Sequence, residues 1–467
     1  MQMSHLVGTL FAAVGFVAAT AAAAHALLNK RRPQSAFGWI AVCFSLPFAG
    51  ALLYYLFGIN RVETRAKKLL TAHPEPHCPT EYVGTPPPQL ASLAKLGLAV
   101  TDWPLTTGNR LEVFHDAQRT FAAMLAAIEG AQRYVHFATY IFDGGPLGQR
   151  FATALTAAAA RGVDVRVLLD GVGELYSAHP IRSLLRGTGV RFARFLPPRI
   201  WPPSMSINLR NHRKSLVVDG REAFTGGINV RDRYLAESPE QRMVDLHVRV
   251  AGPVVAQIET VFLRDWQFAT DGPAETPPLP SPPQGAALCR AVTDGPDGEL
   301  ARLTTLLIGA IGSARHRIAI MTPYFLPPRE LIAPLQAAAL AGIDVAVILP
   351  AQNNLPYIHR ATRHMLWELL QRGVQMYYQP EPFVHSKLFY CDDHYAQIGS
   401  ANMDSRSLRL NFEMNIEIYD RDFVAELAQH FDSVRARSTP ITLATVDGRK
   451  LGTKLLDGAA WLFSPYL

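Results

Sequence analysis

Two long stretches near the start of the chain are apolar and contain no Asp, Glu, Lys or Arg; they cover residues 6–28 and 36–59. As a helix, each would be about 34 Å long, enough to cross a hydrocarbon core of about 30 Å. Pro47 lies inside the second stretch, where membrane helices tolerate it, and Trp39 and Tyr54 lie toward its ends, where aromatic rings anchor at the interface. We therefore expect two transmembrane helices.

A cleaved signal peptide is the alternative for the first stretch, because an alanine-rich site lies around residues 22–26. Against it, no lysine or arginine precedes the stretch and a second apolar stretch follows at once. Basic residues flank the second stretch on both sides, at positions 30–32 and 61–68, so the positive-inside rule leaves the orientation open. Two crossings would place the start of the chain and its large C-terminal part on the same side.

Beyond the apolar stretches, the pattern changes to alternating helices and strands, and it occurs twice. An alanine-rich helix is followed by a glycine that ends it and then by a strand rich in β-branched residues. The strand covers residues 164–169 in the first copy and residues 344–349 in the second. Upstream, residues 134–142 and 317–325 form a second matching pair of predicted strands. The offset of about 180 residues is too long for a solenoid repeat. It predicts two homologous α/β halves.

Proline-rich segments divide the chain. Residues 86–88 and residues 276–284 read as linkers. A further proline-rich stretch at residues 197–203 surrounds Trp201 and fits either a segment that dips into a membrane interface or a rigid loop. The predicted organisation is a membrane anchor (1–70), a first half (71–275), a linker (276–284) and a second half (285–467).

The composition agrees with a membrane-associated protein of several domains. The 467 residues are 49% hydrophobic and 18% charged, below the roughly 25% charged that is usual for soluble proteins. The net charge of +6 suits an anionic partner such as an acidic membrane surface or nucleic acid, although a merely basic globule fits equally well. Four single, scattered cysteines argue against both a zinc site and a disulfide framework.

Each predicted half carries the same polar motif, H-x-K-x4-D followed by x6-G-[G/S]-x-N. One copy would be a weak signal, but two copies at matching positions of repeated halves are a strong one. The first copy consists of His212, Lys214, Asp219, Gly226, Gly227 and Asn229. The second consists of His385, Lys387, Asp392, Gly399, Ser400 and Asn402.

The spacing suits chemistry at a phosphodiester. On a strand, the histidine and the lysine two residues later share one face. The glycines let the backbone approach closely and the asparagine amide can donate a hydrogen bond. Together these groups supply a nucleophile or acid and the donors that stabilise charge on phosphate oxygens. We therefore expect no metal ion and no cofactor.

The motifs resemble those of the phospholipase D superfamily, and the resemblance extends over nearly the whole chain. NHRKSLVVDGREAFTGGINVRDRYL is similar to the first motif of bacterial cardiolipin synthases. MTPYFLPP and SANMDSRSLRLNFE resemble the second half of that family, as do the apolar N-terminal stretches. The resemblance implies an α/β fold class, with two phospholipase D-like α/β/α halves that form one pseudo-twofold catalytic unit after two transmembrane helices.

The resemblance also implies a two-step mechanism and a role for each motif residue. His212 is expected to attack phosphorus and His385 to serve as the acid and base. An acidic partner for each histidine is expected at Glu413 for His385 and at Asp245 for His212. Lys214, Lys387, Asn229, Asn402 and Ser400 would contact the phosphate. Asp219 and Asp392 complete the two motifs, with a structural role behind the site as the favoured reading.

Three functions remain open from the sequence. The leading one is a phosphatidyltransferase that converts two phosphatidylglycerol molecules into cardiolipin and glycerol, with phosphatidylethanolamine as another possible donor. The second is a phospholipase or nuclease that uses water, although two membrane spans disfavour a nucleic-acid substrate. The third, a non-catalytic membrane scaffold, is disfavoured by the two intact motifs. The family implies phospholipid partners, no nucleic acid and a multi-pass protein of the bacterial inner membrane with its catalytic part at the cytoplasmic face; the oligomeric state stays open.

Overall fold

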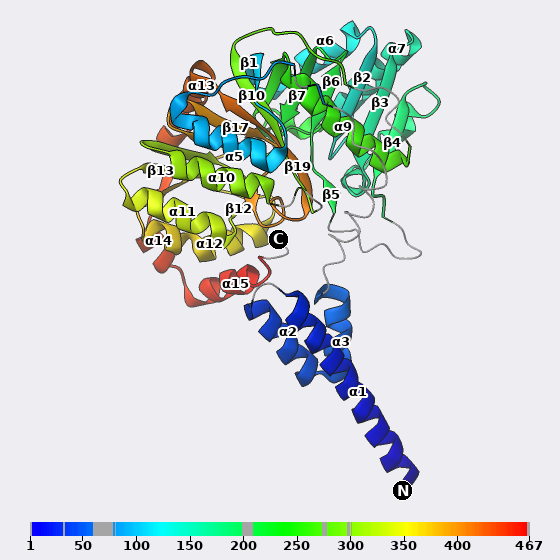
Figure 1. Cartoon of the computed structure of the whole chain (residues 1–467), viewed down its shortest axis with the longest axis vertical. Helices are drawn as coiled ribbons and strands as arrows, with labels where there is room; N and C mark the ends of the chain where they lie inside the picture. The colour runs from blue at the N-terminus through cyan, green and yellow to red at the C-terminus, as the bar shows by residue number, and fades with distance from the viewer. Residues whose placement is uncertain are drawn as a thin grey trace. The chain divides into compact units, whose positions relative to one another are not determined.

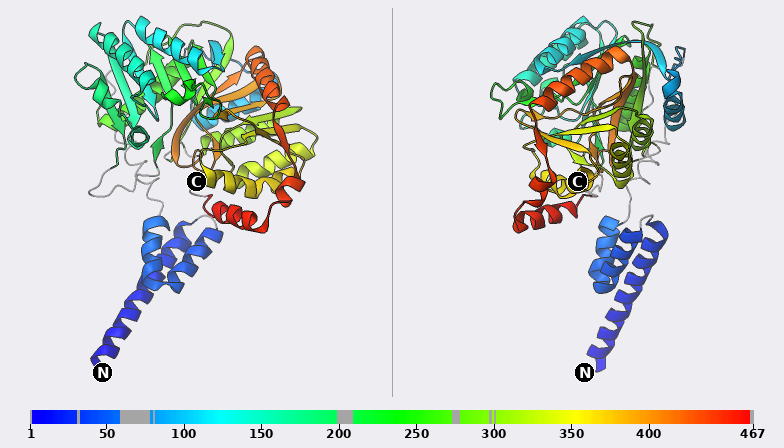
Figure 2. Two further views of the ribbon diagram at one scale, coloured as in Figure 1. Left: turned by 180° about the vertical axis from the view of Figure 1, so that it is seen from behind. Right: turned by 90° about the vertical axis from the view of Figure 1, so that its left-hand side faces the viewer.

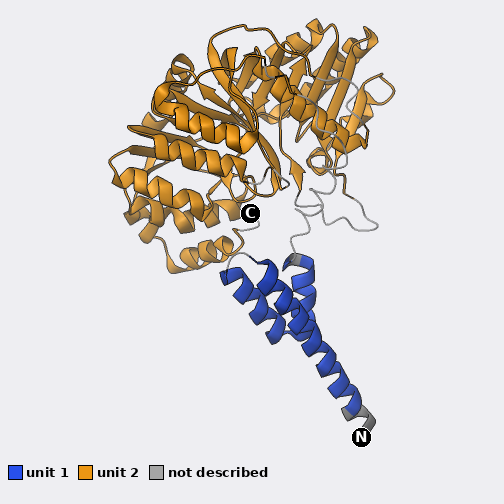
Figure 3. Cartoon of the chain, in the orientation of Figure 1, with its two compact units in different colours: residues 1–68 blue, residues 69–467 orange. Residues whose placement is uncertain are grey.

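The computed structural model divides the chain into two compact units, residues 1–68 and residues 69–467 (Figure 3). The basic residues at 61–68, Trp201 and the start of the predicted linker at 276–284 lie outside the described residues. The structure describes residues 2–30, 33–58, 78–79, 81–198, 209–272, 278–296, 299 and 301–464.

The first unit begins with one long apolar helix, α1 (Gln2–Asn29). Residues Leu6–Asn29 have a mean hydropathy of 2.0, and only 17% of their most apolar window is buried inside the protein. Among the described residues, this is the one helix that is long and apolar enough to cross a membrane. The first apolar stretch thus forms one long helix, as expected.

The second apolar stretch does not form the single spanning helix that we expected. It forms α2 (Pro33–Ser45), α3 (Pro47–Leu53) and a short π-helix, η1 (Tyr54–Gly58). A proline disfavours helical backbone at the residue before it, and the helix breaks at Leu46, where φ is −134° and ψ is 76°. A Cβ at Gly50 would lie 2.2 Å from the Val42 carbonyl oxygen. The stretch therefore folds back on itself as a helical hairpin.

The second unit is built from strands and helices in alternation (Figure 1). Its described strands are β1 (Thr106–Phe114), β2 (Tyr134–Thr139), β3 (Asp164–Asp170), β4 (Arg191–Phe195), β5 (Arg210–Asn211), β6 (Ser215–Val218), β7 (Glu222–Gly226), β8 (Met243–Val244), β9 (His247–Ala251), β10 (Ala287–Asp294), β11 (Arg317–Met321), β12 (Phe325–Leu326), β13 (Asp344–Pro350), β14 (Gln375–Gln379), β15 (Phe383–Val384), β16 (Leu388–Cys391), β17 (Tyr395–Gly399), β18 (Met403–Asp404), β19 (Asn411–Tyr419) and β20 (Thr439–Ile441). Its described α-helices are α5 (Ala91–Thr101), α6 (Ala117–Gly130), α7 (Pro146–Ala160), α8 (Arg182–Leu185), α9 (Val254–Thr270), α10 (Arg302–Ser313), α11 (Arg329–Leu340), α12 (Pro356–Leu370), α13 (Arg421–Ala436), α14 (Leu443–Asp447) and α15 (Leu451–Trp461).

One continuous sheet runs through both halves of this unit. Its strand order is β20-β14-β13-β11-β16-β17-β19-β10-β1-β9-β7-β6-β2-β3-β4. The halves join where β10 and β1 pair antiparallel, and outward from this junction the strands of the two halves match one for one as far as β14 and β4. The predicted strand pairs appear as β2 beside β3 and β11 beside β13, both parallel.

The predicted glycine stops lie where helices α7 and α11 end. Gly162 and Gly342 have φ angles of 87° and 89°, in the left-handed region that favours glycine after a helix. Each is followed directly by the strand that the sequence predicts, β3 or β13.

The strands are buried on both faces, which makes each half an α/β/α sandwich. In β13, Val345 and Val347 belong to one apolar core and Ala346 and Ile348 to another. Helices α10, α11 and α12 cover the first of these faces, α6 and α7 cover the equivalent face of the first half, and α9 and α13 share the core that spans both halves. Both views in Figure 2 show helices on the two sides of the sheet.

Helix α5 crosses the boundary that we predicted between the halves. It lies in the expected first half, but Leu93 and Ala94 are buried in the same core as α10, α11 and α12. Gly97 packs so closely on Arg290 that a Cβ would lie 1.7 Å from a guanidinium nitrogen. The halves are therefore interlocked within one compact unit.

Candidate active site

Both motifs meet at one cavity between the halves. His212 and His385 line it together with Asn229 and Asn402, and its volume is about 280 Å³. All four residues are buried. The fold thus brings the repeated motifs into a single site, as their matching positions in the two halves predict.

Two short strand pairs connect the motif segments of one half to strands of the other half. Strand β5 pairs parallel with β19, and the His212 N–H donates to the Phe412 carbonyl at 2.9 Å. Strand β15 pairs parallel with β8, and the His385 N–H donates to the Val244 carbonyl at 2.7 Å. Each histidine is consequently held against a strand of the opposite half.

This exchange corrects our assignment of the acidic partners. His212 Nδ1 lies 3.0 Å from a carboxylate oxygen of Glu413, and His385 Nδ1 lies 2.8 Å from a carboxylate oxygen of Asp245. The sequence-based pairing of Glu413 with His385 and of Asp245 with His212 was wrong. The sequence identified the two carboxylates correctly but assigned each to the wrong histidine. Spacing within one half does not show that strands pair across the halves.

The environment of both imidazoles favours the neutral form over the charged one. Burial lowers the pKa of His212, the ammoniums of Lys214 and Lys387 lower it further, and Glu413 opposes them. Burial and the same two ammoniums lower the pKa of His385 well below its usual value. An Nδ1–H that donates to the carboxylate leaves Nε2 with its lone pair, which is the form a nucleophile requires.

The two carboxylates that orient the histidines differ in the direction of their pKa shifts. Burial opposes ionisation of Glu413, but His212, Lys214 and a hydrogen bond from Ser400 outweigh it, so the Glu413 pKa is lowered. Burial raises the pKa of Asp245 to about 6, although Lys387 and a backbone N–H oppose the rise. Glu413 is therefore the more firmly ionised of the two.

Two lysines place positive charge beside the histidines. Burial lowers the pKa of Lys214 to about 7 and that of Lys387 to about 8, in part offset by Glu413 and Asp245. The Lys214 ammonium donates to the His212 carbonyl at 2.6 Å, and the Lys387 ammonium lies 2.7 Å from His385 Nδ1 and 3.8 Å from Asp245. Such compact, closely held cations suit an anionic substrate.

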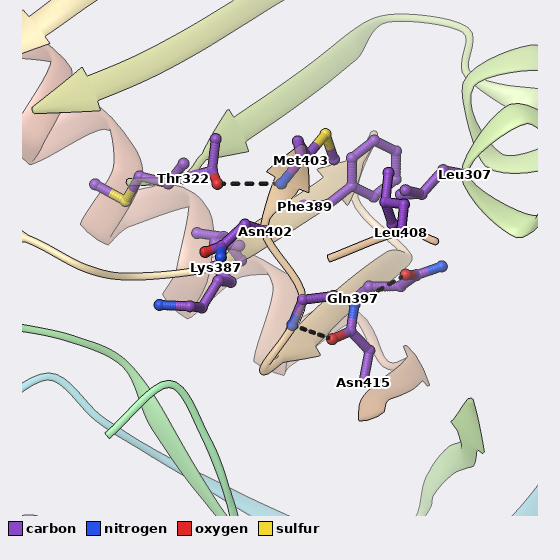
Figure 4. A pocket seen from close by; sticks show the side chains of 12 residues that line it. Leu307, Thr322, Lys387, Phe389, Gln397, Asn402, Met403, Leu408 and Asn415 are labelled. Atoms are coloured by element: carbon purple, nitrogen blue, oxygen red, sulfur yellow. Dashed lines mark hydrogen bonds between the residues drawn. The ribbon is translucent and has the colours of Figure 1, made fainter. Parts of the chain in front are cut away.

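The asparagines are fixed by their own half. Asn229 accepts a hydrogen bond from the Ile141 N–H at 3.1 Å, and Asn402 donates to the Ser407 hydroxyl at 3.1 Å. Figure 4 shows Asn402 beside Lys387, where the loop is held by the Met403 N–H donating to the Thr322 hydroxyl. Both asparagines thus sit on anchored loops at the cavity wall.

Ser400 and its counterpart Gly227 explain the G-[G/S] position of the motif. The fully buried Ser400 hydroxyl donates to the Glu413 carboxylate at 2.5 Å. A Cβ at Gly227 would lie 2.3 Å from the Asp245 carboxylate. Ser400 therefore contacts the carboxylate that orients His212, whereas the first half has no room for a side chain at this point.

The motif aspartates lie behind the site. Asp219 accepts hydrogen bonds from the backbone N–H groups of residues 132–134 at 2.8 to 3.0 Å, and Asp392 does the same for residues 315–317 at 2.7 to 2.9 Å. Both adopt the left-handed conformation, with φ of 53° and 52°. They fix the start of strands β2 and β11, which agrees with the structural reading of these two residues.

Sequence reasoning missed several residues that line the cavity. Tyr140 packs edge-on to His212 with ring centroids 5.1 Å apart, and Tyr324 packs edge-on to His385 at 6.2 Å. Tyr140 directly follows β2, whereas Tyr324 lies three residues after β11, so the two tyrosines are shifted by one position in the repeat and sequence alignment of the halves does not pair them.

Arg210 and Arg406 also line the cavity. Arg406 follows Asn402 by four residues, as the cavity residue Arg233 follows Asn229, so this pair was a usable signal. Arg210 has no such counterpart, because Phe383 stands at the equivalent position of the second half.

Family comparisons identify the group to which this architecture belongs. A family model described as "Cardiolipin synthase, PLD-like domain" matches residues 124–266 and 307–435, more than half of the chain. The chain belongs to this family. A second model, described as "Phospholipase_D-nuclease N-terminal", matches residues 17–58.

Several bacterial cardiolipin synthases are similar to this chain over almost its whole length. The cardiolipin synthase of Geobacillus thermodenitrificans is 33% identical over 94% of this chain and 90% of its own length. Cardiolipin synthase A of Pseudomonas entomophila is 33% identical over 96% of this chain and 95% of its own. The crystal structure of a phosphatidylserine synthase from Haemophilus influenzae is 13% identical, with a TM-score of 0.63 over 80% of this chain and 100% of that one. This last likeness shows a shared fold.

Proposed function

We propose that this enzyme transfers a phosphatidyl group between two phosphatidylglycerol molecules, which gives cardiolipin and glycerol. The observation that carries the proposal is the single cavity at which His212 and His385 meet, each hydrogen-bonded to a carboxylate of the opposite half. The names of the relatives, cardiolipin synthase and cardiolipin synthase A, support the choice of product.

In the first step, the neutral His212 attacks the phosphorus of the donor lipid through Nε2. A phosphorus–nitrogen bond forms and the bond to the glycerol oxygen breaks, while His385, in its protonated form, gives its proton to the departing glycerol. Glu413 at 3.0 Å from Nδ1 stabilises the positive charge that develops on His212. The ionised state of Glu413 favours His212 over His385 as the nucleophile.

In the second step, His385 accepts the proton of the hydroxyl group of a second phosphatidylglycerol. The hydroxyl oxygen bonds to phosphorus as the phosphorus–nitrogen bond breaks, and both histidines return to their starting forms. Asn229 and Asn402 at the cavity wall, with Lys214 and Lys387 beside the histidines, stabilise the charge that develops on the non-bridging oxygens. Ser400 acts through Glu413, as a positioning residue.

The membrane supplies both substrates and confines the enzyme. The apolar helix α1 and the chain's net charge of +6 support attachment to an anionic bilayer. We place the protein in the bacterial plasma membrane with the catalytic unit at the cytoplasmic face. Phosphatidylethanolamine remains compatible as an alternative donor, because the motif residues contact only the shared phosphodiester.

Product analysis tests this function. The purified protein in liposomes receives phosphatidylglycerol as the only lipid, and mass spectrometry follows the products. Cardiolipin with an equimolar amount of glycerol is the expected result. Phosphatidic acid with glycerol would identify a hydrolase instead, and inactivity of a His212→Ala variant serves as the control that any product comes from this site.

A further inference from the structure

Two arginines add a second cationic position to the cavity that contains the histidines. Arg210 comes from β5 of the first half, and Arg406 from the loop after β18 of the second half. Burial and the nearby Arg406 both lower the pKa of the Arg210 guanidinium, whereas Asp170 and Tyr140 raise it. The two guanidiniums are thus close enough to repel each other, and Tyr140, which packs on His212, lies near both.

The neighbouring carboxylates hold this arrangement in place. Asp170 is buried and accepts hydrogen bonds from three backbone N–H groups, including that of Asn211 at 2.8 Å. Asp404 accepts from the Ser407 N–H at 2.8 Å, and burial raises its pKa to about 7. The cavity also contains Arg231 and Arg233, so its wall is cationic beyond the motif lysines. A second anion is favoured at such a wall.

The distance between Arg210 and His212 fits phosphatidylglycerol, which serves as both donor and acceptor in the proposed reaction. Arg210 and His212 are alternate residues of extended backbone, so they share one face and lie about 7 Å apart along the strand. In an acceptor phosphatidylglycerol, a three-carbon glycerol separates the attacking hydroxyl from the lipid's own phosphate. The equivalent position in the second half is the uncharged Phe383, so the two halves differ at the residue two positions before the motif histidine.

We propose that Arg210 and Arg406 bind the phosphate of the acceptor phosphatidylglycerol while Lys214 and Lys387 hold the phosphate that reacts. This rests on the proposed function and specifies it: the second site selects an alcohol that carries a phosphodiester over water or free glycerol. Arginine suits the role because its planar guanidinium can donate two hydrogen bonds to one phosphate.

Comparing two acceptor alcohols, one with a phosphate and one without, tests the proposed acceptor-phosphate site. With phosphatidylglycerol as donor, cardiolipin formation reports the phosphate-bearing acceptor, and incorporation of labelled glycerol into phosphatidylglycerol reports a neutral one. Arg406→Gln and Arg210→Gln should lower cardiolipin formation about 10- to 100-fold, the loss of a charged hydrogen bond. Glycerol exchange should fall far less, which also shows that each variant is folded. Arg409→Gln, on the same loop but exposed, is the matched control and should alter neither rate.

The outcomes are distinct. Equal losses in both reactions, or no loss in either, would overturn the acceptor site. A wild-type enzyme that exchanges glycerol but makes no cardiolipin would instead contradict the proposed function.

Independent contacts in the first unit bear on membrane topology. The Lys30 ammonium, just after α1, donates to the Gly58 carbonyl at the end of η1, and His25 is hydrogen-bonded to the Tyr54 hydroxyl at 2.8 Å. The hairpin of α2 and α3 therefore starts and ends at the same end of α1.

The turn of the hairpin lies partway along α1. Phe48, next to the break, stacks on Phe11 with ring centroids 4.2 Å apart, and a Cβ at Gly15 would lie 2.7 Å from the Phe48 ring. As a helix of 13 residues, α2 is about 20 Å long, which is too short to cross a hydrocarbon core of about 30 Å.

We infer that α1 is the single crossing and that α2 and α3 form a re-entrant hairpin that enters and leaves at the cytoplasmic face. Lys30, which contacts the end of η1, then lies at the cytoplasmic end of α1, as the positive-inside rule favours. Backbone that turns within the membrane is tolerated where other helices of the protein cover it, as α1 does here.

Cysteine labelling distinguishes the two topologies. Single cysteines replace Ser4, Gln34 and Thr64 in an active background without the native cysteines, and a membrane-impermeant maleimide is added to intact and to opened cells. The hairpin predicts that Gln34→Cys and Thr64→Cys are labelled only after opening, while Ser4→Cys is labelled in intact cells. Labelling of Gln34→Cys in intact cells, with Ser4→Cys and Thr64→Cys protected, would establish two crossings and overturn the hairpin.

Discussion

His212 is hydrogen-bonded through Nδ1, at 3.0 Å, to Glu413, a residue 201 positions later in the chain that belongs to the opposite half. The reciprocal pair, His385 and Asp245, spans the halves in the other direction at 2.8 Å. Each motif histidine thus takes its carboxylate partner from the opposite half. The duplicated motif is consequently one catalytic unit, and its chemistry depends on the strand exchange that joins the halves.

Replacing Glu413 by Gln should reduce kcat about 10²- to 10⁴-fold, because the positive charge that forms on His212 loses its partner. Glu413 also raises the pKa of His212, so the acid limb of the pH profile should move to lower pH in this variant. Steady-state rates against pH check both effects. Ser400→Ala, which removes one hydrogen bond to the same carboxylate, should lose much less; an unshifted acid limb in the Glu413 variant would contradict the assigned role.

Replacing Gly227 by Ala should impair catalysis through Asp245. The new Cβ would lie 2.3 Å from this carboxylate and push it away from His385. We expect a fall in kcat of at least about tenfold, with a smaller change in KM, as for a lost orienting contact. Gly312→Ala is the control, since nothing lies within 4 Å of its Cβ position. Equal activity of the two variants would show that Asp245 tolerates displacement.

The lysines should set the alkaline limb of the pH profile. With pKa values of about 7 and 8, Lys214 and Lys387 are charged at lower pH and lose their charge as pH rises through these values. We therefore expect kcat/KM to decline in the mildly alkaline range. A bound phosphodiester favours the charged lysines, so the limb in kcat should lie at higher pH. Lys214→Arg and Lys387→Arg should lower the rate but move the limb upward, and an unmoved limb would assign it to other groups.

Chelation of divalent cations should leave activity largely intact. The two asparagines that line the cavity and the two lysines beside the histidines supply the charge stabilisation that a metal would otherwise provide. Turnover of phosphatidylglycerol is measured before and after treatment with EDTA. A loss that added Mg²⁺, Ca²⁺ or Zn²⁺ restores would require a metal in the mechanism.

Much of the catalytic unit could be predicted because its two halves repeat local patterns. The glycine stops before β3 and β13 and the β-branched strands are short-range signals, and they appear where the sequence predicts them. Helix α5 could not be assigned in this way. Its contacts with Arg290 and the second-half core join segments far apart in the sequence, and no local pattern encodes them.

The same limit applies to the site and to the anchor. The motif residues were predictable from spacing, but the partners of Glu413 and Asp245 depend on β5 pairing with β19 and β15 with β8. In the anchor, length and hydropathy alone indicated two spans. The break at Leu46 is a local backbone effect of Pro47, and the fold-back at Gly50 is a packing contact; hydropathy registers neither.

The covalent intermediate offers the most direct test of the account. His385→Ala, which lacks the acid, is incubated with a phosphatidyl donor whose nitrophenol leaving group needs no proton, and the digested protein is analysed by mass spectrometry. The account predicts a phosphatidyl adduct on the peptide that contains His212, absent from a His212→Ala control. An adduct on His385 in the His212→Ala protein, with none on His212 in the first variant, would reverse the roles of the two histidines. Turnover of this donor without an adduct on either histidine would contradict the two-step mechanism.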